Sequence, residues 1–360
     1  MRSEGPDQAA HSTQPAQTSQ LFAEAAEAPL AAARFLQAQT SGLLALGQQW
    51  RSQPPAALLT IARGSSDHAA HYLAYLVMAR LGRLVTSLPM SLITLYQSKL
   101  HCEGLTALTF SQSGQSPDLV ASVRYIRQQG GQTLAFVNDA HSPLAQAAQH
   151  IFELQAGPEH SVAATKSFIC QLVAGAALVA AWQDDGSQPA GLQQALHTLP
   201  AALTQAWSAD WHAALPALVQ AHRLYVIGRG TGLPVAMELA LKFKEMCGIH
   251  AEAFSGAEVQ HGPMALIEPG FAMLVLAPAG PAQAGLLEVA AQMRQRGAQV
   301  LLAAPEGTAH SQLPLAATGH VDLDPISLAL SAYRMLEALA RTRGLNPDQP
   351  RHLQKVTRTE

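Results

Sequence analysis

Two stretches of this chain share one order of features: a short apolar run, a glycine-rich turn and an amphipathic segment. The first apolar run, 56–62, leads through the turn Arg63–Asp67 (RGSSD) to an expected helix over 68–80. The second run, 223–227, leads through the turn Gly228–Gly232 (GRGTG) to an expected helix over 234–246. Strand, glycine turn and helix open a βαβ unit, whose strands are parallel. The repeat therefore predicts two α/β units in one chain.

Apolar strand-like runs and helix-like segments continue to alternate after each opening. In the first half we expect strands at 105–110, 133–137 and 151–154, with helices beginning near residues 117 and 142. In the second half we expect strands at 272–277 and 299–303 with a helix over 283–296 between them. This pattern predicts an α/β fold of two parallel sheets flanked by helices, each doubly wound and flavodoxin-like. Neither glycine turn has the Gly-x-Gly-x-x-Gly spacing of a dinucleotide site.

Hydroxyl groups gather where one predicted strand meets a helix, in Phe110–Ser116 (FSQSGQS). A helix N-terminus offers free N–H groups and a partial positive charge, and serine hydroxyls add donors. Together they predict an anion site, for a phosphate above all. The Lys-Ser/Thr ending of a nucleotide P-loop is missing, which favours a small phosphorylated metabolite. The alternative is a Ser-Gly turn that only caps a helix.

Composition narrows the class of protein further. The chain has 360 residues, 13% charged residues and a net charge of −3, which argues against binding to nucleic acid or to a membrane. The polar N-terminus lacks the layout of a signal peptide. Cys102, Cys170 and Cys247 are too far apart for a disulfide framework or a zinc site, so we expect a protein of the reducing cytoplasm. His68 and His71 are spaced like a solvated helix face, and we expect neither a metal nor a cofactor.

Several short motifs follow one another along the chain. The first half holds Arg63–Ser66 (RGSS), Ser111–Gly114 (SQSG) and Gly157–Lys166 (GPEHSVAATK). The second half adds Leu241–Glu245 (LKFKE), and further on EVQHGP at 258–263 and DQPRHLQKVT at 348–357. From about residue 45 the series resembles the double-SIS (sugar isomerase) family. It is most similar to the isomerase half of glutamine–fructose-6-phosphate aminotransferase.

The resemblance implies a division of the chain into five parts. These are a lead-in and helix at 1–45, a first SIS domain at 46–187, a helical connector at 188–214, a second SIS domain at 215–345 and an active-site tail at 346–360.

The resemblance also implies roles for individual residues. His261 would open the sugar ring from the neighbouring subunit, which implies a homodimer with shared active sites, and Glu245 would move the proton between C1 and C2. Lys355 would form a Schiff base or act by its charge, and Lys242 would stabilise the enediolate-like intermediate. By spacing alone, Lys242 and Glu245 could instead be a surface ion pair. The substrate and its phosphate would be bound by Ser66, Ser111, Gln112, Ser113, Ser116, Val162, Ala164 and Glu258. Ala164 stands where the synthase has a serine.

One departure from the aminotransferase directs the expected reaction. About 45 residues precede the first domain, too few for a glutaminase core. We therefore expect the branch that releases ammonia, the SIS-type glucosamine-6-phosphate deaminases, which convert glucosamine-6-phosphate and water to fructose-6-phosphate and ammonia. Galactosamine-6-phosphate deaminase, a fructosamine-phosphate deglycase and an ammonia-dependent synthase are alternatives. A non-catalytic sugar-phosphate sensor is the alternative from another class.

Overall fold

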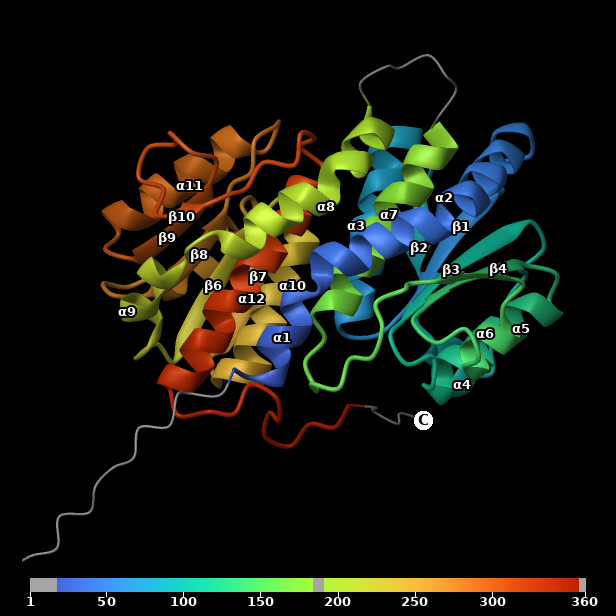
Figure 1. Cartoon of the computed structure of the whole chain (residues 1–360), viewed down its shortest axis with the longest axis horizontal. Coiled ribbons are helices and arrows are strands. Elements are labelled where there is room, and N and C mark those ends of the chain that lie inside the picture. The colour runs from blue at the N-terminus through green and yellow to red at the C-terminus, as the bar shows by residue number, and fades with distance from the viewer. Residues whose placement is uncertain (1–17, 184–190, 356–360) are drawn as a thin grey trace, which may run out of the picture.

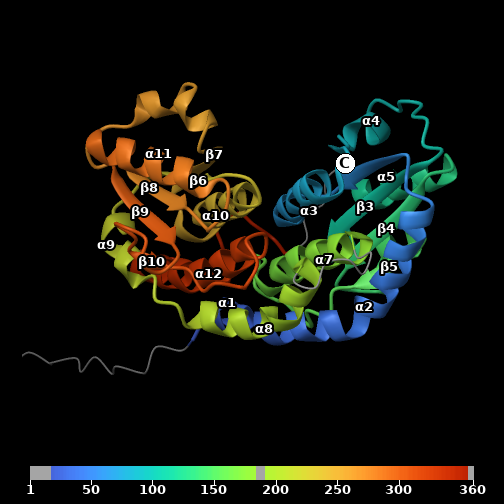
Figure 2. The same cartoon turned by 90° about the horizontal axis from the view of Figure 1, so that it is seen from above.

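Two α/β domains lie side by side on a shared layer of helices, as Figures 1 and 2 show. The computed structural model describes residues 18–183 and 191–355. Each domain is built around a five-stranded sheet in which all strand pairs are parallel. The predicted fold class, two parallel sheets flanked by helices, is confirmed.

The first sheet has the strand order β2-β1-β3-β4-β5, which is the flavodoxin-like order. Its strands have apolar side chains on both faces, as a parallel sheet covered by helices requires. The strands are β1 (Ala57–Ile61), β2 (Val85–Ser87), β3 (Leu105–Ser111), β4 (Gln132–Val137) and β5 (His150–Glu153). The helices between them are α3 (Ser65–Leu81), α4 (Ser91–Thr94), α5 (Pro117–Gln128) and α6 (Pro143–Ala147).

The second sheet repeats this topology, with the order β10-β9-β8-β6-β7. Numbered within the domain, this is again 2-1-3-4-5, read from the other edge. The strands are β6 (Arg223–Gly228), β7 (His250–Ser255), β8 (Ala272–Leu276), β9 (Gln299–Ala304) and β10 (Leu313–Pro314). The helices are α10 (Gly232–Cys247), α11 (Gln283–Gln295) and the short 3₁₀ turns η2 (Glu258–Gln260) and η3 (Pro263–Leu266).

The shared helical layer joins the two domains into one core (Figure 2). Within it α2 packs along α7, and Gly47 allows the close approach because a Cβ there would overlap the Ala181 carbonyl. The layer and its connections contain α1 (Gln20–Ala26), α2 (Ala28–Ser52), α7 (Lys166–Gln183), α8 (Leu192–Ser208), η1 (His212–Ala214), α9 (Leu215–Leu218) and α12 (Asp324–Thr342).

One helix in the described part of the chain, α7, has the length and apolar composition of a membrane span. It is 94% buried within the protein, which is the position of a core helix in a folded domain.

The expected elements are present, with shifted ends. The helix expected over 68–80 begins at Ser65, so the turn before it is shorter than expected. The boundary expected at residue 45 falls inside α2, which continues without a break. The start of the expected connector at 188 and most of the polar lead-in lie outside the described residues.

Candidate active site

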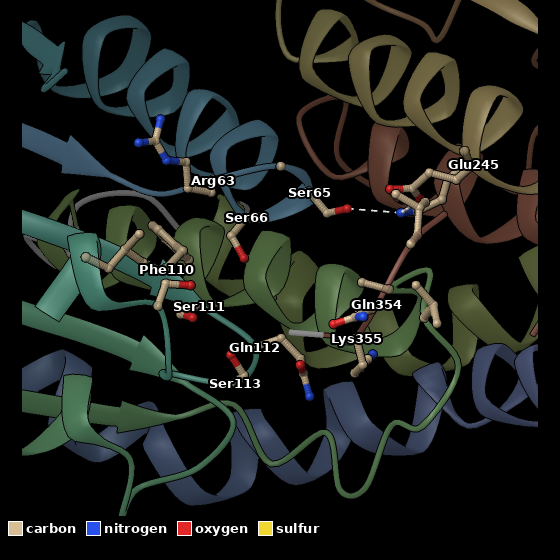
Figure 3. A pocket seen from close by; sticks show the side chains of 17 residues that line it. Arg63, Ser65, Ser66, Phe110, Ser111, Gln112, Ser113, Glu245, Gln354 and Lys355 are labelled. Carbon is tan, nitrogen blue, oxygen red and sulfur yellow. Dashed lines mark hydrogen bonds and ion pairs between the residues drawn. The ribbon is translucent and has the colours of Figure 1, made fainter. Parts of the chain in front are cut away.

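The strand order creates a crevice at the carboxyl edge of the first sheet. From β1 the chain runs through α3 to β2 on one side, and from β3 it runs through α5 to β4 on the other. Ligands of open α/β sheets bind where neighbouring strands lead in opposite directions. A cavity of about 340 Å³ lies there, lined by the turns after β1 and β3 (Figure 3).

The turn after β3 is stabilised by hydrogen bonds between its own serine side chains and its backbone. Ser111 Oγ accepts a hydrogen bond from the Gly114 N–H at 3.0 Å, and Ser113 Oγ accepts one from the Gln115 N–H at 3.3 Å. Gly114 has a φ of 62°, in the left-handed region that glycine adopts without strain. Ser116 is the N-cap of α5, and its side chain makes no capping bond. The loop thus presents hydroxyls beside a helix N-terminus, which suits an anion.

A second helix N-terminus borders the same cavity. Ser65 and Ser66 open α3, and Ser66 Oγ accepts a hydrogen bond from Gln171 Nε2 at 3.0 Å. Arg63 fixes this turn to α5, because its Nε and Nη2 donate to Asp118 Oδ2 at 3.1 and 2.9 Å. Two helix dipoles therefore direct partial positive charge into one crevice.

The second domain contributes a charged pair through α10, which packs against α3. Lys242 Nζ donates to Glu245 Oε2 at 2.7 Å and to Ser65 Oγ at 3.1 Å, the second bond crossing between the domains (Figure 3). The Lys242 side chain is 1% exposed, so this is not a surface ion pair. Burial alone would lower the pKa of Lys242, but Glu238 and Glu245 outweigh it and raise the pKa above its ordinary value.

The C-terminal tail closes one side of the cavity with Lys355. Its Nζ donates to the Ser161 carbonyl at 2.7 Å and to Glu159 Oε2 at 3.2 Å. Glu159 is buried and also accepts from the Thr165 and Ser167 N–H groups at the start of α7. Burial opposes ionisation of Glu159, but Lys355 and these donors hold its pKa below the ordinary value. Lys355 is thus paired with a buried carboxylate.

Most of the predicted site residues meet in this cavity. Its lining includes Ser66, Ser111, Gln112, Ser113, Ser116, Val162, Ala164, Lys242, Glu245 and Lys355. Glu258 and His261 do not line it. They lie in η2 and in the turn after it, both exposed, and the His261 N–H donates to the Glu258 carbonyl at 2.9 Å. Their roles stay predictions.

Three residues near the cavity had no predicted role. Glu159 was quoted only as part of a motif. Glu238 precedes Lys242 by four residues, a spacing that predicts a helical ion pair. His68 was placed on a solvated face, which is wrong: its Nδ1 lies 2.9 Å from Glu238 Oε2, and its side chain is 14% exposed. The partner of His68 belongs to the other domain, so spacing along the chain could not reveal it.

In residues 18–183 and 191–355 no group of three or more His, Cys, Asp or Glu side chains is placed to hold a metal ion. Cys102, Cys170 and Cys247 are all buried and free. Burial raises the pKa of Cys170 and of Cys247 to about 12, so neither is a ready nucleophile.

Fold and site together define a double α/β protein with a serine-rich loop at a sheet switch point and a buried lysine–carboxylate pair beside it. The chain belongs to the SIS domain family, whose pattern matches residues 55–181 and 217–318.

Similar proteins include both enzymes and solved structures. A glutamine–fructose-6-phosphate aminotransferase (isomerizing) of Aeropyrum pernix is 35% identical over 326 residues, covering 84% of this chain and 51% of that protein. The chain therefore spans about half the length of this relative. A Silicibacter pomeroyi structure, provisionally named a phosphosugar isomerase, has a TM-score of 0.85 and 40% identity, covering 92% of this chain and all of that one. A glucosamine-6-phosphate deaminase of Thermotoga maritima shares the fold, with a TM-score of 0.74, 19% identity and coverage of 95% and 100%.

Proposed function

We propose that this protein is a glucosamine-6-phosphate deaminase that isomerises its substrate and releases ammonia. The observation that carries the proposal is the single cavity in which a serine-rich anion loop faces Glu245, Lys242 and Lys355. An anion loop would hold the 6-phosphate, and a fixed phosphate would place C1 and C2 at a defined distance from it. The SIS family and the aminotransferase relative support a phosphosugar with an amino group at C2.

The proposed reaction begins from the open-chain aldehyde. Glu245 takes the proton from C2, and the electron pair forms a C1–C2 double bond as the C1 oxygen gains a proton. Return of a proton to C1 gives a protonated imine at C2, whose C=N bond is formed by the nitrogen lone pair. Water adds to that carbon, and ammonia leaves with the bonding electrons, so one substrate and one water give fructose-6-phosphate and ammonia. The proton transfers need a base, and the negative charge that develops during them needs positive charge nearby.

Two ammonium groups would supply that charge. Lys242 lies 2.7 Å from Glu245, and Lys355 closes the cavity from the tail. Positive groups held in a fixed position stabilise negative charge that develops on the C1 oxygen. Because Lys355 is paired with Glu159, we propose an electrostatic role for it. In the deaminase direction the substrate already carries its nitrogen, so the reaction needs no Schiff base with the enzyme.

Ring opening would require a second copy of the chain. His261 does not line the cavity of its own subunit, and we propose that it enters the site of a partner in a homodimer. Exposed apolar side chains at α4 and η3, namely Leu95, Tyr96 and Leu266, would gain cover from such a contact. A net charge of −3 and only 13% charged residues suit an enzyme for a small molecule, which we place in the cytoplasm.

The first test is incubation of the purified protein with glucosamine-6-phosphate, following ammonia and fructose-6-phosphate together. We expect equal release of both, lost in Glu245→Gln and retained in Glu288→Gln, which changes an exposed glutamate on α11. Release from galactosamine-6-phosphate or a fructosamine phosphate instead would change the substrate. Binding of all three without turnover would make the protein a sensor.

A complementation assay tests the shared site. Glu245→Gln and His261→Ala should each be inactive alone. In mixed dimers one site joins an intact Glu245 to an intact His261, so a random mixture should recover about a quarter of the sites. No recovery from a mixture that has exchanged subunits would contradict the partner role of His261.

The aminotransferase relative favours a second candidate, the reverse reaction. The same groups could join free ammonia to fructose-6-phosphate and isomerise the product. Rates measured from both sides at matched ammonia concentrations distinguish the two directions.

A further inference from the structure

A buried chain of polar groups joins α3 of the first domain to the proposed base on α10. His68 Nδ1 lies 2.9 Å from Glu238 Oε2. Glu238 Oε1 lies 3.3 Å from Lys242 Nζ, and Lys242 Nζ lies 2.7 Å from Glu245 Oε2. The chain therefore starts on one domain and ends at a group that lines the cavity on the other.

Glu238 is the middle of this chain and is fully buried, with 0% of its side chain exposed. A buried carboxylate must be paired and hydrogen-bonded to stay charged. Burial opposes its ionisation, but Lys242 and His68 outweigh burial and hold the pKa of Glu238 below its ordinary value. Tyr333 of α12 adds a weaker contact, its hydroxyl 3.5 Å from Glu238 Oε1. His68 is thus one of the few groups that offset this negative charge.

Lys242 can donate only a limited number of hydrogen bonds. Its ammonium has three N–H donors, and three partners surround it: Glu245, Glu238 and Ser65. If Glu238 loses the donor from His68, its charge draws more strongly on Lys242. The ammonium then neutralises Glu245 less well and is less firmly directed toward the cavity.

Other charged groups also face this region. Glu159 and Lys355 stand on the tail side of the cavity, and Tyr333 comes from α12. None of them reaches Glu238 at the distance of His68. The same helix, α3, carries His68 and the serine turn that borders the anion site, so phosphate binding and the setting of the base share one rigid element.

We propose that His68 is a positioning residue for proton transfer: it pairs Glu238, so that Lys242 stays directed at Glu245. The inference rests on the proposed function of Glu245 as the base. It assigns His68 no contact with substrate.

Two substitutions distinguish the effect of losing the hydrogen bond from the effect of changing the size of the side chain. His68→Asn keeps an N–H donor on the atom after Cγ, where Nδ1 stands, and His68→Leu removes the donor. The matched control is His71→Leu on the same helix, because His71 is 37% exposed and its acidic neighbour, Asp67, is 4.0 Å away. All variants are checked for folding by circular dichroism before kinetics.

We expect His68→Leu to lower kcat for glucosamine-6-phosphate about tenfold to a hundredfold, the range for a hydrogen bond to a charged group. KM should stay within about twofold, because the anion loop is untouched. The acid limb of the kcat profile should move to higher pH, since the negative charge of Glu238 is less well offset. His68→Asn should restore most of kcat, and His71→Leu should behave like the wild type.

Unchanged kcat in His68→Leu overturns the proposal. So does a loss of kcat with an unmoved acid limb and no recovery in His68→Asn, because packing alone would then explain it. If the wild type does not turn over glucosamine-6-phosphate, the proposed function fails separately. The ¹H–¹⁵N signal of the buried Lys242 ammonium then decides: it should shift in His68→Leu and not in His71→Leu, and an unmoved signal refutes the chain.

Discussion

Replacing Gly114 with alanine should damage the anion loop in two separable ways. The φ of 62° is one that alanine adopts at a cost of about 1–2 kcal/mol. The new Cβ would also overlap Ser142 Oγ and lie 2.5 Å from Ser142 Cβ. Ser142 is the N-cap of α6 and accepts the Ala145 N–H at 3.3 Å, so moving it forfeits a cap that contributes about 1 kcal/mol. We expect a total loss of stability of about 2–3 kcal/mol.

The control is Gly307→Ala, which has a φ of 82° and no atom within 4 Å of its new Cβ. It should cost only the backbone part. Urea unfolding gives the stabilities, and titration with inorganic phosphate gives the affinity, which should fall in Gly114→Ala and not in Gly307→Ala. Adding Ser142→Gly should make the double variant less unstable than the two single losses added together. Equal losses in Gly114→Ala and Gly307→Ala with unchanged phosphate affinity would refute the reasoning.

Three further predictions follow from the charges and thiols of the structure. Glu238→Gln should lose about 3–5 kcal/mol at pH 7, because it leaves Lys242 half-paired in a buried site. Since the pKa of Glu238 is lowered on folding, its contribution is present above its ordinary value of 4.5 and is lost as pH falls below it. Thermal melts should therefore show the wild type and the variant converging in acid, and parallel curves would contradict this. If Lys355 acts by its charge, Lys355→Arg should keep a measurable part of the wild-type kcat and Lys355→Met should keep almost none. An equal loss of kcat in both variants would instead favour a Schiff base at Lys355. Cys170 and Cys247, with pKa values of about 12, should resist iodoacetamide in the folded protein at pH 8 and react after unfolding, as mass spectrometry can follow.

The sequence was most informative where one local rule decides the outcome. Buried parallel strands are continuous apolar runs, and the glycine turns mark where helices begin, so the repeat predicts both sheets. The position of the serine loop could be predicted in the same way, because Ser111–Ser116 is a contiguous segment between a strand and a helix, whereas its binding of an anion stays a prediction.

Contacts between distant segments could not be predicted by local rules. The bond between His68 and Glu238 joins residues 170 positions apart, and that between Glu159 and Lys355 spans 196. Position within a helix explains why Lys242 and Glu245 meet, but burial of that pair depends on the packing of α10 against α3. Tertiary packing, not spacing, turned a pattern typical of a surface ion pair into a buried one.

The repeated fold has a second switch point, whose loops carry different side chains from those of the first. In the second domain the loop after β8, Ala277–Pro281 (APAGP), corresponds to the serine loop after β3. Its two prolines have no N–H and it carries no hydroxyl, so it offers an anion far fewer donors. The other turn of that crevice is the glycine turn after β6. Tyr75 of the first domain lies close to it, because its Oη would be 3.4 Å from a Cβ placed on Gly230. The first helices of the two domains, α3 and α10, thus pack together: α10 brings Lys242 and Glu245 to the cavity that the serine loop also lines, and α3 brings the Tyr75 ring to the glycine turn. The same topology therefore occurs twice in the chain. The side chains of the loops after β3 and β8 determine which of the two crevices offers an anion more hydrogen-bond donors.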